Sequence, residues 1–257
     1  MIALQQASSS GFFVAVVAAW TACFVGLEVV RRLWPAAWPA PAVPRSRRPW
    51  FDVAVCVGVI VAVLGIGQTW NAGWLRWRWP GAWDHLAYAL AQAVIWAPLP
   101  LALWLRRQPA TSAWTGGSFL LHRLGVGVVT GALAVTLYLA LRGELSRWPG
   151  ILERAFGSHA LAHALPVYME GVGIAFVFVR LQWVFGNTLA AVVPGLLFAL
   201  AHVPRGLAAG ESVATLAAFF AFNTAFVTVL LLALARYRDV VALGVAHWLM
   251  DLAIEAF

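Results

Sequence analysis

The feature that most constrains this chain is the recurrence of apolar stretches, each about 20 residues long. Of its 257 residues, 63% are hydrophobic and 11% are charged, whereas ordinary soluble domains contain about 25% charged residues. A soluble fold of this composition would lack the polar residues needed to cover its core. Roughly 20 apolar residues in an α-helix cross a bilayer core about 30 Å thick. The sequence therefore predicts an all-α, polytopic integral membrane helix bundle.

We expect about eight transmembrane helices in a single domain that covers residues 1–257. The segment between the first two helices contains Pro35, Pro39, Pro41 and Pro44, and such a run of prolines cannot continue a helix, so it is predicted to be a surface loop. The second connection is rich in tryptophan, and indole rings favour the headgroup zone of a membrane, so it is predicted to be interfacial. The expected helices are 11–30, 51–70, 86–105, 124–142, 159–181, 187–204, 212–235 and 240–257.

The positive charge of the chain fits a membrane better than a nucleic acid. The net charge is +7, and all seventeen basic residues are arginine. They occur singly or in short groups at the ends of apolar runs, where basic loop residues flank membrane spans. We therefore expect lipid as a partner, no nucleic acid, and a multi-pass location in the cell (inner) membrane. The absence of lysine beside abundant alanine, arginine and tryptophan suggests GC-rich coding and a bacterial source.

Ionisable side chains inside the predicted spans gather in the second half of the chain. Each costs about 2.5–3.5 kcal/mol to insert, so each is a candidate for function. The first four spans are nearly free of them, and Glu28 lies beside Arg31 and Arg32 at a helix end, which indicates an interfacial cluster. Those in the last four spans are His159, His163, Glu170, His202, His247, Asp251 and Glu255.

Two pairs of these residues have helical spacing. Phe198 and His202 are four residues apart, so they share a helix face and the aromatic ring can orient the imidazole. His247 and Asp251 have the same spacing, and a carboxylate beside an imidazole selects its tautomer and raises its basicity. This suits a general base or a metal ligand. The alternative for the second pair is an internal ion pair that only ties two helices together.

A third group lies on the helix that carries Glu170. His159, His163 and Glu170 fall within a narrow stripe at 100° per residue, although Pro166 between them is expected to weaken the geometry. The alternative for the two histidines is a position at the membrane surface. Glu170 is harder to explain in that way, because it lies well inside the span with no nearby basic residue.

These motifs resemble those of the CPBP intramembrane proteases, the family that includes the CAAX prenyl endopeptidases. That family carries Glu-Glu-x-x-x-Arg, Phe-x-x-x-His and His-x-x-x-Asn/Asp on consecutive C-terminal helices. The second motif matches Phe198 to His202, and the third matches His247 to Asp251. The resemblance covers about residues 155–257, which we expect to form a CPBP-like core.

The first motif of the family is altered in this chain. The family's spacing, with a Phe-Gly pair at Phe185 and Gly186, places Met169 at the first Glu, Glu170 at the second and Ile174 at the Arg. The first Glu of the family is held to activate the hydrolytic water, and methionine has no oxygen that could accept a proton. Either Glu170 takes over this role or the peptidase activity has been lost.

The resemblance implies an intramembrane endopeptidase that hydrolyses a peptide bond in a membrane-associated peptide or protein substrate. Glu170 would be the general base, His202 and His247 would bind a metal or stabilise the oxyanion, and Asp251 would orient His247. His202, His247 and Glu170 could hold Zn²⁺ or another divalent metal, or could act on water without one. We expect these side chains to converge in one cavity.

Two alternatives remain open. The first is a catalytically inactive CPBP relative that acts as a membrane scaffold or partner protein. The second is a small transporter whose polar residues line a pathway, although the chain lacks two similar halves.

Overall fold

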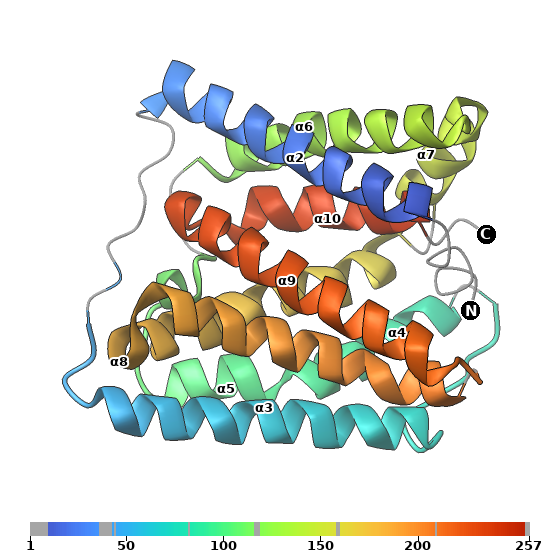
Figure 1. The fold of residues 1–257 in the computed structure, drawn as a ribbon. Helices are drawn as coiled ribbons and strands as arrows, with labels where there is room; N and C mark the ends of the chain where they lie inside the picture. The colour runs from blue at the N-terminus through green and yellow to red at the C-terminus, as the bar shows by residue number, and fades with distance from the viewer. Residues whose placement is uncertain are drawn as a thin grey trace.

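The computed structural model describes residues 10–35, 43, 45–81, 83–115, 119–157, 160–208 and 210–254 (Figure 1). All regular structure in these residues is helical, which confirms the predicted all-α membrane fold. The helices are α2 (Ser10–Leu33), α3 (Pro49–Asn71), α4 (Trp83–Trp96), α5 (Pro98–Leu105), η2 (Ala110–Ala113), α6 (Leu120–Arg142), η3 (Leu145–Arg147), α7 (Trp148–Phe156), α8 (Ala160–Ala208), α9 (Val213–Tyr237) and α10 (Val240–Ile254).

Five of the described helices are long and apolar enough to cross a membrane, and the bent pair α4 and α5 adds a sixth span. The apolar stretch of α8 extends over 43 residues, about twice the length that a bilayer requires. It is interrupted at Gly186, whose φ of 75° and ψ of 178° leave the helical region, a conformation that only glycine adopts readily. With α8 counted as two spans and the shorter α10 included, the described residues contain about eight spans, as predicted.

The two halves of α8 form an antiparallel hairpin about Gly186. Figure 1 shows the chain of α8 reversing its direction at the end of the bundle away from the two termini. Residues at nearly equal distances from Gly186 contribute to the same cavity. They are Glu170 with His202, Ile174 with Phe198, and Val177 with Pro194.

Two local features differ from the helices expected from sequence. The predicted helix 86–105 is bent by 45° between α4 and α5, because Pro98 and Pro100 remove helix hydrogen bonds next to Ala97. The short helix α7 was not predicted, since its nine residues mix apolar and charged side chains and form no long apolar run. Pro166, in contrast, leaves α8 helical throughout its first half.

The helices pack around two buried apolar clusters. The first joins α2, α6 and α10, and it includes the fully buried Tyr138 and Met250. The second joins α3, α5, η2, α8 and α9, and it includes the fully buried Phe178. In Figure 1, α2 and α6 lie along one side of the bundle and α3 along the other, with α10, α9 and α8 between them. Helix α10 is therefore held inside the bundle.

Helices α6 and α10 approach each other closely at two glycines. A Cβ atom at Gly127 would lie 2.6 Å from the Ala242 carbonyl oxygen, and one at Gly131 would lie 2.8 Å from the Ala246 Cα atom. Gly127 and Gly131 are four residues apart, as are Ala242 and Ala246, so two stripes of small residues face each other. Such stripes allow membrane helices to pack backbone against backbone. This contact fixes the position of α10.

A buried ion pair joins the start of α10 to α6. The Arg123 guanidinium donates two hydrogen bonds to the Asp239 carboxylate, with Nε 2.8 Å from Oδ2, and both side chains are under 10% exposed. Asp239 Oδ1 also accepts the backbone N–H of Val241 at 2.8 Å, in the first turn of α10. The carboxylate thus satisfies both a buried cation and the open end of a helix.

We predict that Gly127→Ala lowers the stability of the bundle by about 1–3 kcal/mol, because the added methyl group overpacks a backbone contact. Gly125→Ala is the matched control on the same helix, since a Cβ at Gly125 meets no atom within 4 Å. The measurement is the thermal unfolding midpoint of each purified variant in detergent. Equal midpoints for the two variants would contradict the close approach of α6 and α10.

We also predict that Asp239→Ala destabilises the protein by about 3–5 kcal/mol, because it leaves Arg123 buried without its partner. Adding Arg123→Met should recover part of this loss by removing the unpaired charge. The control is Asp84→Ala, which breaks a pair whose arginine, Arg78, is 81% exposed and should cost less than about 1 kcal/mol. The measurement is the fraction of each variant that stays monodisperse after heating. Similar losses for Asp239→Ala and Asp84→Ala would contradict a stabilising role of the buried Arg123–Asp239 pair.

Candidate functional site

A cavity of about 370 Å³ lies between α3, α4 and the two halves of α8. Most of its wall is apolar, with aliphatic side chains from α3 and the indole of Trp96 from α4. Four polar side chains interrupt this wall: Glu170, His202, Gln68 and Gln92. Glu170 and His202 were predicted from sequence as site residues, and the hairpin at Gly186 brings them into this one space. An apolar cavity with a few polar groups is the usual form of a binding site.

The geometry of His202 is set by the residue one turn before it. Its Nδ1 lies 2.8 Å from the Phe198 carbonyl oxygen, and because a carbonyl only accepts, Nδ1 must donate this hydrogen bond. The Phe198 and His202 rings lie 4.5 Å apart, in the packing that their spacing predicted. In the neutral imidazole, Nε2 is therefore the nitrogen without a proton. Nε2 is the atom through which His202 accepts a proton or a hydrogen bond.

The face of α8 that lines the cavity carries Glu170 and Ile174 but not Met169. Glu170, Gly173, Ile174 and Val177 line the cavity with the spacing of one helix face, and Phe176 beside them also contributes to its wall. Met169 is not among the described residues that line the cavity, and it packs against the buried apolar cluster that joins α3, α5, α8 and α9. Glu170 is thus the residue of the altered first motif that places a carboxylate at the wall of the cavity.

Sequence reasoning missed Gln68 and Gln92, because only ionisable residues were weighed as candidates inside the spans. Gln92 is 8% exposed, so its amide is enclosed within the cavity that Glu170 and His202 share. A buried amide in an apolar span is costly unless it is hydrogen-bonded. The search for ionisable residues inside apolar runs would have found both glutamines if it had included uncharged polar side chains.

His247 and Asp251 lie on α10, and they do not appear among the described residues that line the cavity. His247 Nε2 is 3.6 Å from Asp251 Oδ1, so the two share a helix face as predicted, at a separation longer than a hydrogen bond. Gly244, one turn earlier, packs against the Tyr168 ring of α8. This face of α10 is therefore directed toward the first half of α8.

Each of the two histidines lies beside an aromatic ring of another helix. The His202 ring is 6.2 Å from Phe219 of α9, and the His247 ring is 5.7 Å from Trp20 of α2. Trp20 in turn lies 6.2 Å from Phe226, also on α9. The structure thus brings Glu170 and His202 together in one cavity and places His247, with Asp251 one turn further along α10, beside Trp20 of α2. The catalytic roles assigned to these four residues stay predictions.

The other ionisable residues considered from sequence are His163, His159, Glu255 and Glu28. The His163 ring lies 5.6 Å from Tyr88 of α4, whereas His159 and Glu255 lie outside the described residues. Glu28 accepts hydrogen bonds from Arg31 and Arg32 at distances of 2.7–3.0 Å. This confirms the predicted cluster at the end of α2.

The donor groups do not form a ready metal centre. Within the part of the chain that the structure describes, no three side chains of His, Cys, Asp or Glu lie close enough to hold a metal ion. A catalytic zinc site needs three protein ligands and one open position, so this arrangement does not fit one. The zinc expectation for His202, His247 and Glu170 stays a prediction.

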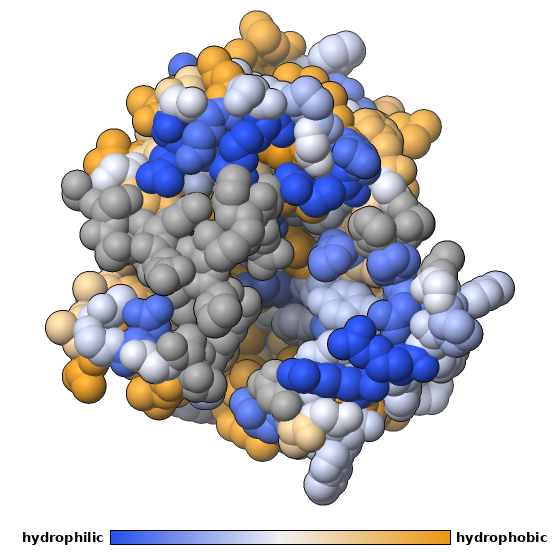
Figure 2. Space-filling model, turned by 90° about the vertical axis from the view of Figure 1, so that its right-hand side faces the viewer, coloured by the Kyte–Doolittle hydropathy of each residue, from blue (hydrophilic) through white to orange (hydrophobic). Residues whose placement is uncertain are grey.

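The cavity extends to the end of the bundle where both termini lie. His202 lies six residues before the end of α8, and Trp70, which also lines the cavity, is next to the last residue of α3. Both helices end on the side of the termini in Figure 1. Figure 2 faces this end and shows a hollow with hydrophilic side chains above it and to its right, and with some hydrophilic surface visible inside it. The cavity is thus placed to exchange water at one membrane surface.

The comparisons with known proteins agree with the motifs. Residues 159–253 match the family model described as type II CAAX prenyl endopeptidase Rce1-like. No curated protein and no solved structure gives a significant match to the chain. The matched region contains both halves of α8 together with α9 and nearly all of α10, and hence Glu170, His202, His247 and Asp251. Residues 159–253 therefore form an Rce1-like domain, which confirms the resemblance to the CPBP family for this part of the chain.

Proposed function

We propose that this protein is an intramembrane endopeptidase that hydrolyses a peptide bond in a membrane-associated substrate, in the manner of the CAAX proteases. The observation that carries the proposal is the cavity shared by Glu170 and His202 inside an otherwise apolar helix bundle. A carboxylate and an imidazole at that depth are costly unless a function retains them. The Rce1-like domain that contains both residues supports the same reaction class.

In the proposed reaction, Glu170 removes a proton from a water molecule, whose oxygen attacks the carbonyl carbon of the scissile bond. His202 Nε2 accepts a hydrogen bond from the second hydrogen of this water and orients it, since Nδ1 is engaged by Phe198. The C–N bond then breaks, and Glu170 returns its proton to the leaving amine. Proton transfer by a positioned carboxylate contributes about 10²–10⁴ to the rate.

The amide of Gln92 is the proposed donor to the oxyanion. It lines the same cavity and, unlike an imidazole, it donates a hydrogen bond at every pH. His247 and Asp251 would support the site from α10, with Asp251 holding the tautomer of His247. The mostly apolar wall of the cavity would accept an apolar segment or a lipid group of the substrate.

One observation favours the alternative of an inactive relative. Met169 and Ile174 stand where the family's first motif has Glu and Arg, so the usual water-activating carboxylate and its partner are missing. In that case the cavity would bind a peptide segment without cleaving it, and the protein would act as a scaffold or partner protein in the membrane.

We predict that Glu170→Gln lowers kcat by about 10²–10⁴, because it removes the proton acceptor and keeps the shape of the side chain. The control is Glu153→Gln, the same change at an exposed glutamate of α7, which should leave turnover unchanged. The assay is cleavage of a prenylated membrane peptide, and of its unprenylated form, by the purified protein in lipid. Wild-type turnover by Glu170→Gln would refute the proposed base.

We predict that Met169→Glu lowers turnover, because the new carboxylate enters an apolar cluster next to the functional Glu170. Met169→Gln is the control for size and polarity without charge. The same peptide assay distinguishes an active endopeptidase from an inactive relative. If the wild type is inactive and Met169→Glu gains turnover that Met169→Gln does not, the protein is an inactive relative and Glu170 is not its base.

A further inference from the structure

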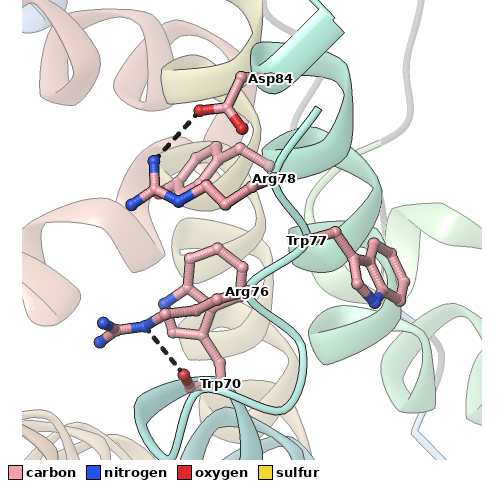
Figure 3. Close-up of a pocket in the computed structure, with 6 residues that line it drawn as sticks. Trp70, Arg76, Trp77, Arg78 and Asp84 are labelled. Carbon is pink, nitrogen blue, oxygen red and sulfur yellow. Dashed lines mark hydrogen bonds and ion pairs between the residues drawn. The ribbon is translucent and has the colours of Figure 1, made fainter. Parts of the chain in front are cut away.

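A second cavity, of about 290 Å³, lies where residues 72–82 connect α3 to α4. Figure 3 shows it with Trp70 at the end of α3, Arg76, Trp77 and Arg78 on the connection, and Asp84 at the start of α4. Tyr88 of α4 completes the lining. The Glu170 and His202 cavity shares Trp70 with this one, but none of its four polar side chains lines the second cavity.

The two arginines form one side of this cavity. Arg76 Nε donates to the Trp70 carbonyl oxygen at 3.2 Å, which anchors the side chain while its two terminal nitrogens stay directed outward. Arg78 Nη1 lies 3.3 Å from Asp84 Oδ2. Figure 3 shows both guanidinium groups extending to the same side, with an open space between them. Two guanidinium groups in this arrangement suit the oxygens of an anion.

The charges around this space do not balance. Asp84 is the one carboxylate among the six described lining residues, against two guanidinium groups. It also accepts the backbone N–H of Trp79 at 3.2 Å and lies in the first turn of α4, where a negative charge is stabilised. Its separation from Arg78 exceeds the roughly 2.7–2.9 Å of a strong charge-assisted bond. One positive charge is thus left over for a ligand.

The surroundings place this cavity in the headgroup zone of a bilayer. Trp74 is 80% exposed, Trp83 is 64% exposed, and Trp77 and Trp79 are 38% and 40% exposed. Indole rings favour the membrane–water interface, so this end of α3 lies at that depth.

The exposed side of α3 extends from the second cavity into the hydrocarbon core of the membrane. Val57, Val61 and Leu64 are 53%, 64% and 41% exposed, and they are spaced as one stripe along the helix. A ligand with an anionic group at the interface and apolar chains below it would match both surfaces.

We propose that Arg76 and Arg78 bind the phosphodiester group of an anionic phospholipid, whose acyl chains lie along the exposed stripe of α3. A zwitterionic lipid is a poorer match, because its ammonium group would lie near a second guanidinium. The bound headgroup would rest against Trp70, which lies between this site and the Glu170 and His202 cavity. The inference does not rest on peptidase activity.

The experiment measures binding of dihexanoyl phosphatidylglycerol, a short-chain soluble lipid, to the delipidated protein by native mass spectrometry. We expect binding to be at least about tenfold weaker in Arg76→Gln/Arg78→Gln, because charged hydrogen bonds to the phosphate are lost. The control is Arg47→Gln/Arg48→Gln, which removes the same charge from two exposed residues before α3. It should bind as the wild type does, and dihexanoyl phosphatidylcholine should bind the wild type more weakly.

Three results would overturn the proposal. Equal lipid binding by Arg76→Gln/Arg78→Gln and the wild type would exclude the two arginines. Equal loss in both double variants would show a non-specific charge effect. Binding of inorganic phosphate or of a peptide with a free terminal carboxylate, where the lipid itself does not bind, would assign the cavity to a free anion or to a peptide.

Discussion

A charged side chain inside an apolar helix bundle must find a partner or a polar cavity, and this constraint organises the whole structure. The Arg123–Asp239 pair ties α6 to the start of α10. Arg180, which is 1% exposed, donates to the Ser112 carbonyl oxygen at 2.7 Å and to the Gln108 side chain, which in turn donates to Asp52. Each buried cation thereby fixes one helix against a connection between two others.

The buried networks of Arg123 and Arg180 lie toward one end of the bundle, and Glu170 and His202 lie toward the other. Arg123, Asp239 and the Arg180 network lie near the starts of α6 and α10 and the turn at Gly186, away from the two termini in Figure 1. Glu170 and His202 lie toward the end that holds the termini. The two buried arginines are thus paired at one end, while polar side chains meet in a cavity toward the other. This division lets a rigid scaffold hold a water-accessible site within the membrane.

The apolar runs were sufficient to predict the helices, because a bilayer allows few other structures. The spacing of Phe198 with His202 and of His247 with Asp251 also predicted their shared faces, since i and i+4 are neighbours on any helix. A cavity was expected from the ionisable residues, but its wall from α3 and α4 could not be predicted, because Gln68 and Gln92 meet Glu170 only after these helices pack against α8. Arg123 and Asp239 are 116 residues apart, so no local pattern connects them. The bend at Ala97 could have been read from Pro98 and Pro100.

The most direct test of a water-accessible cavity at the site is the reactivity of one cysteine. Ala201 lines the cavity next to His202, whereas Leu200, 56% exposed, does not appear among the described lining residues. Cys23 and Cys56 are buried and would be changed to alanine. In oriented vesicles, a membrane-impermeant maleimide should label Ala201→Cys from the side of the termini and leave Leu200→Cys, which faces lipid, unlabelled. Equal labelling of the two positions, or none at Ala201→Cys, would contradict a site that opens to water.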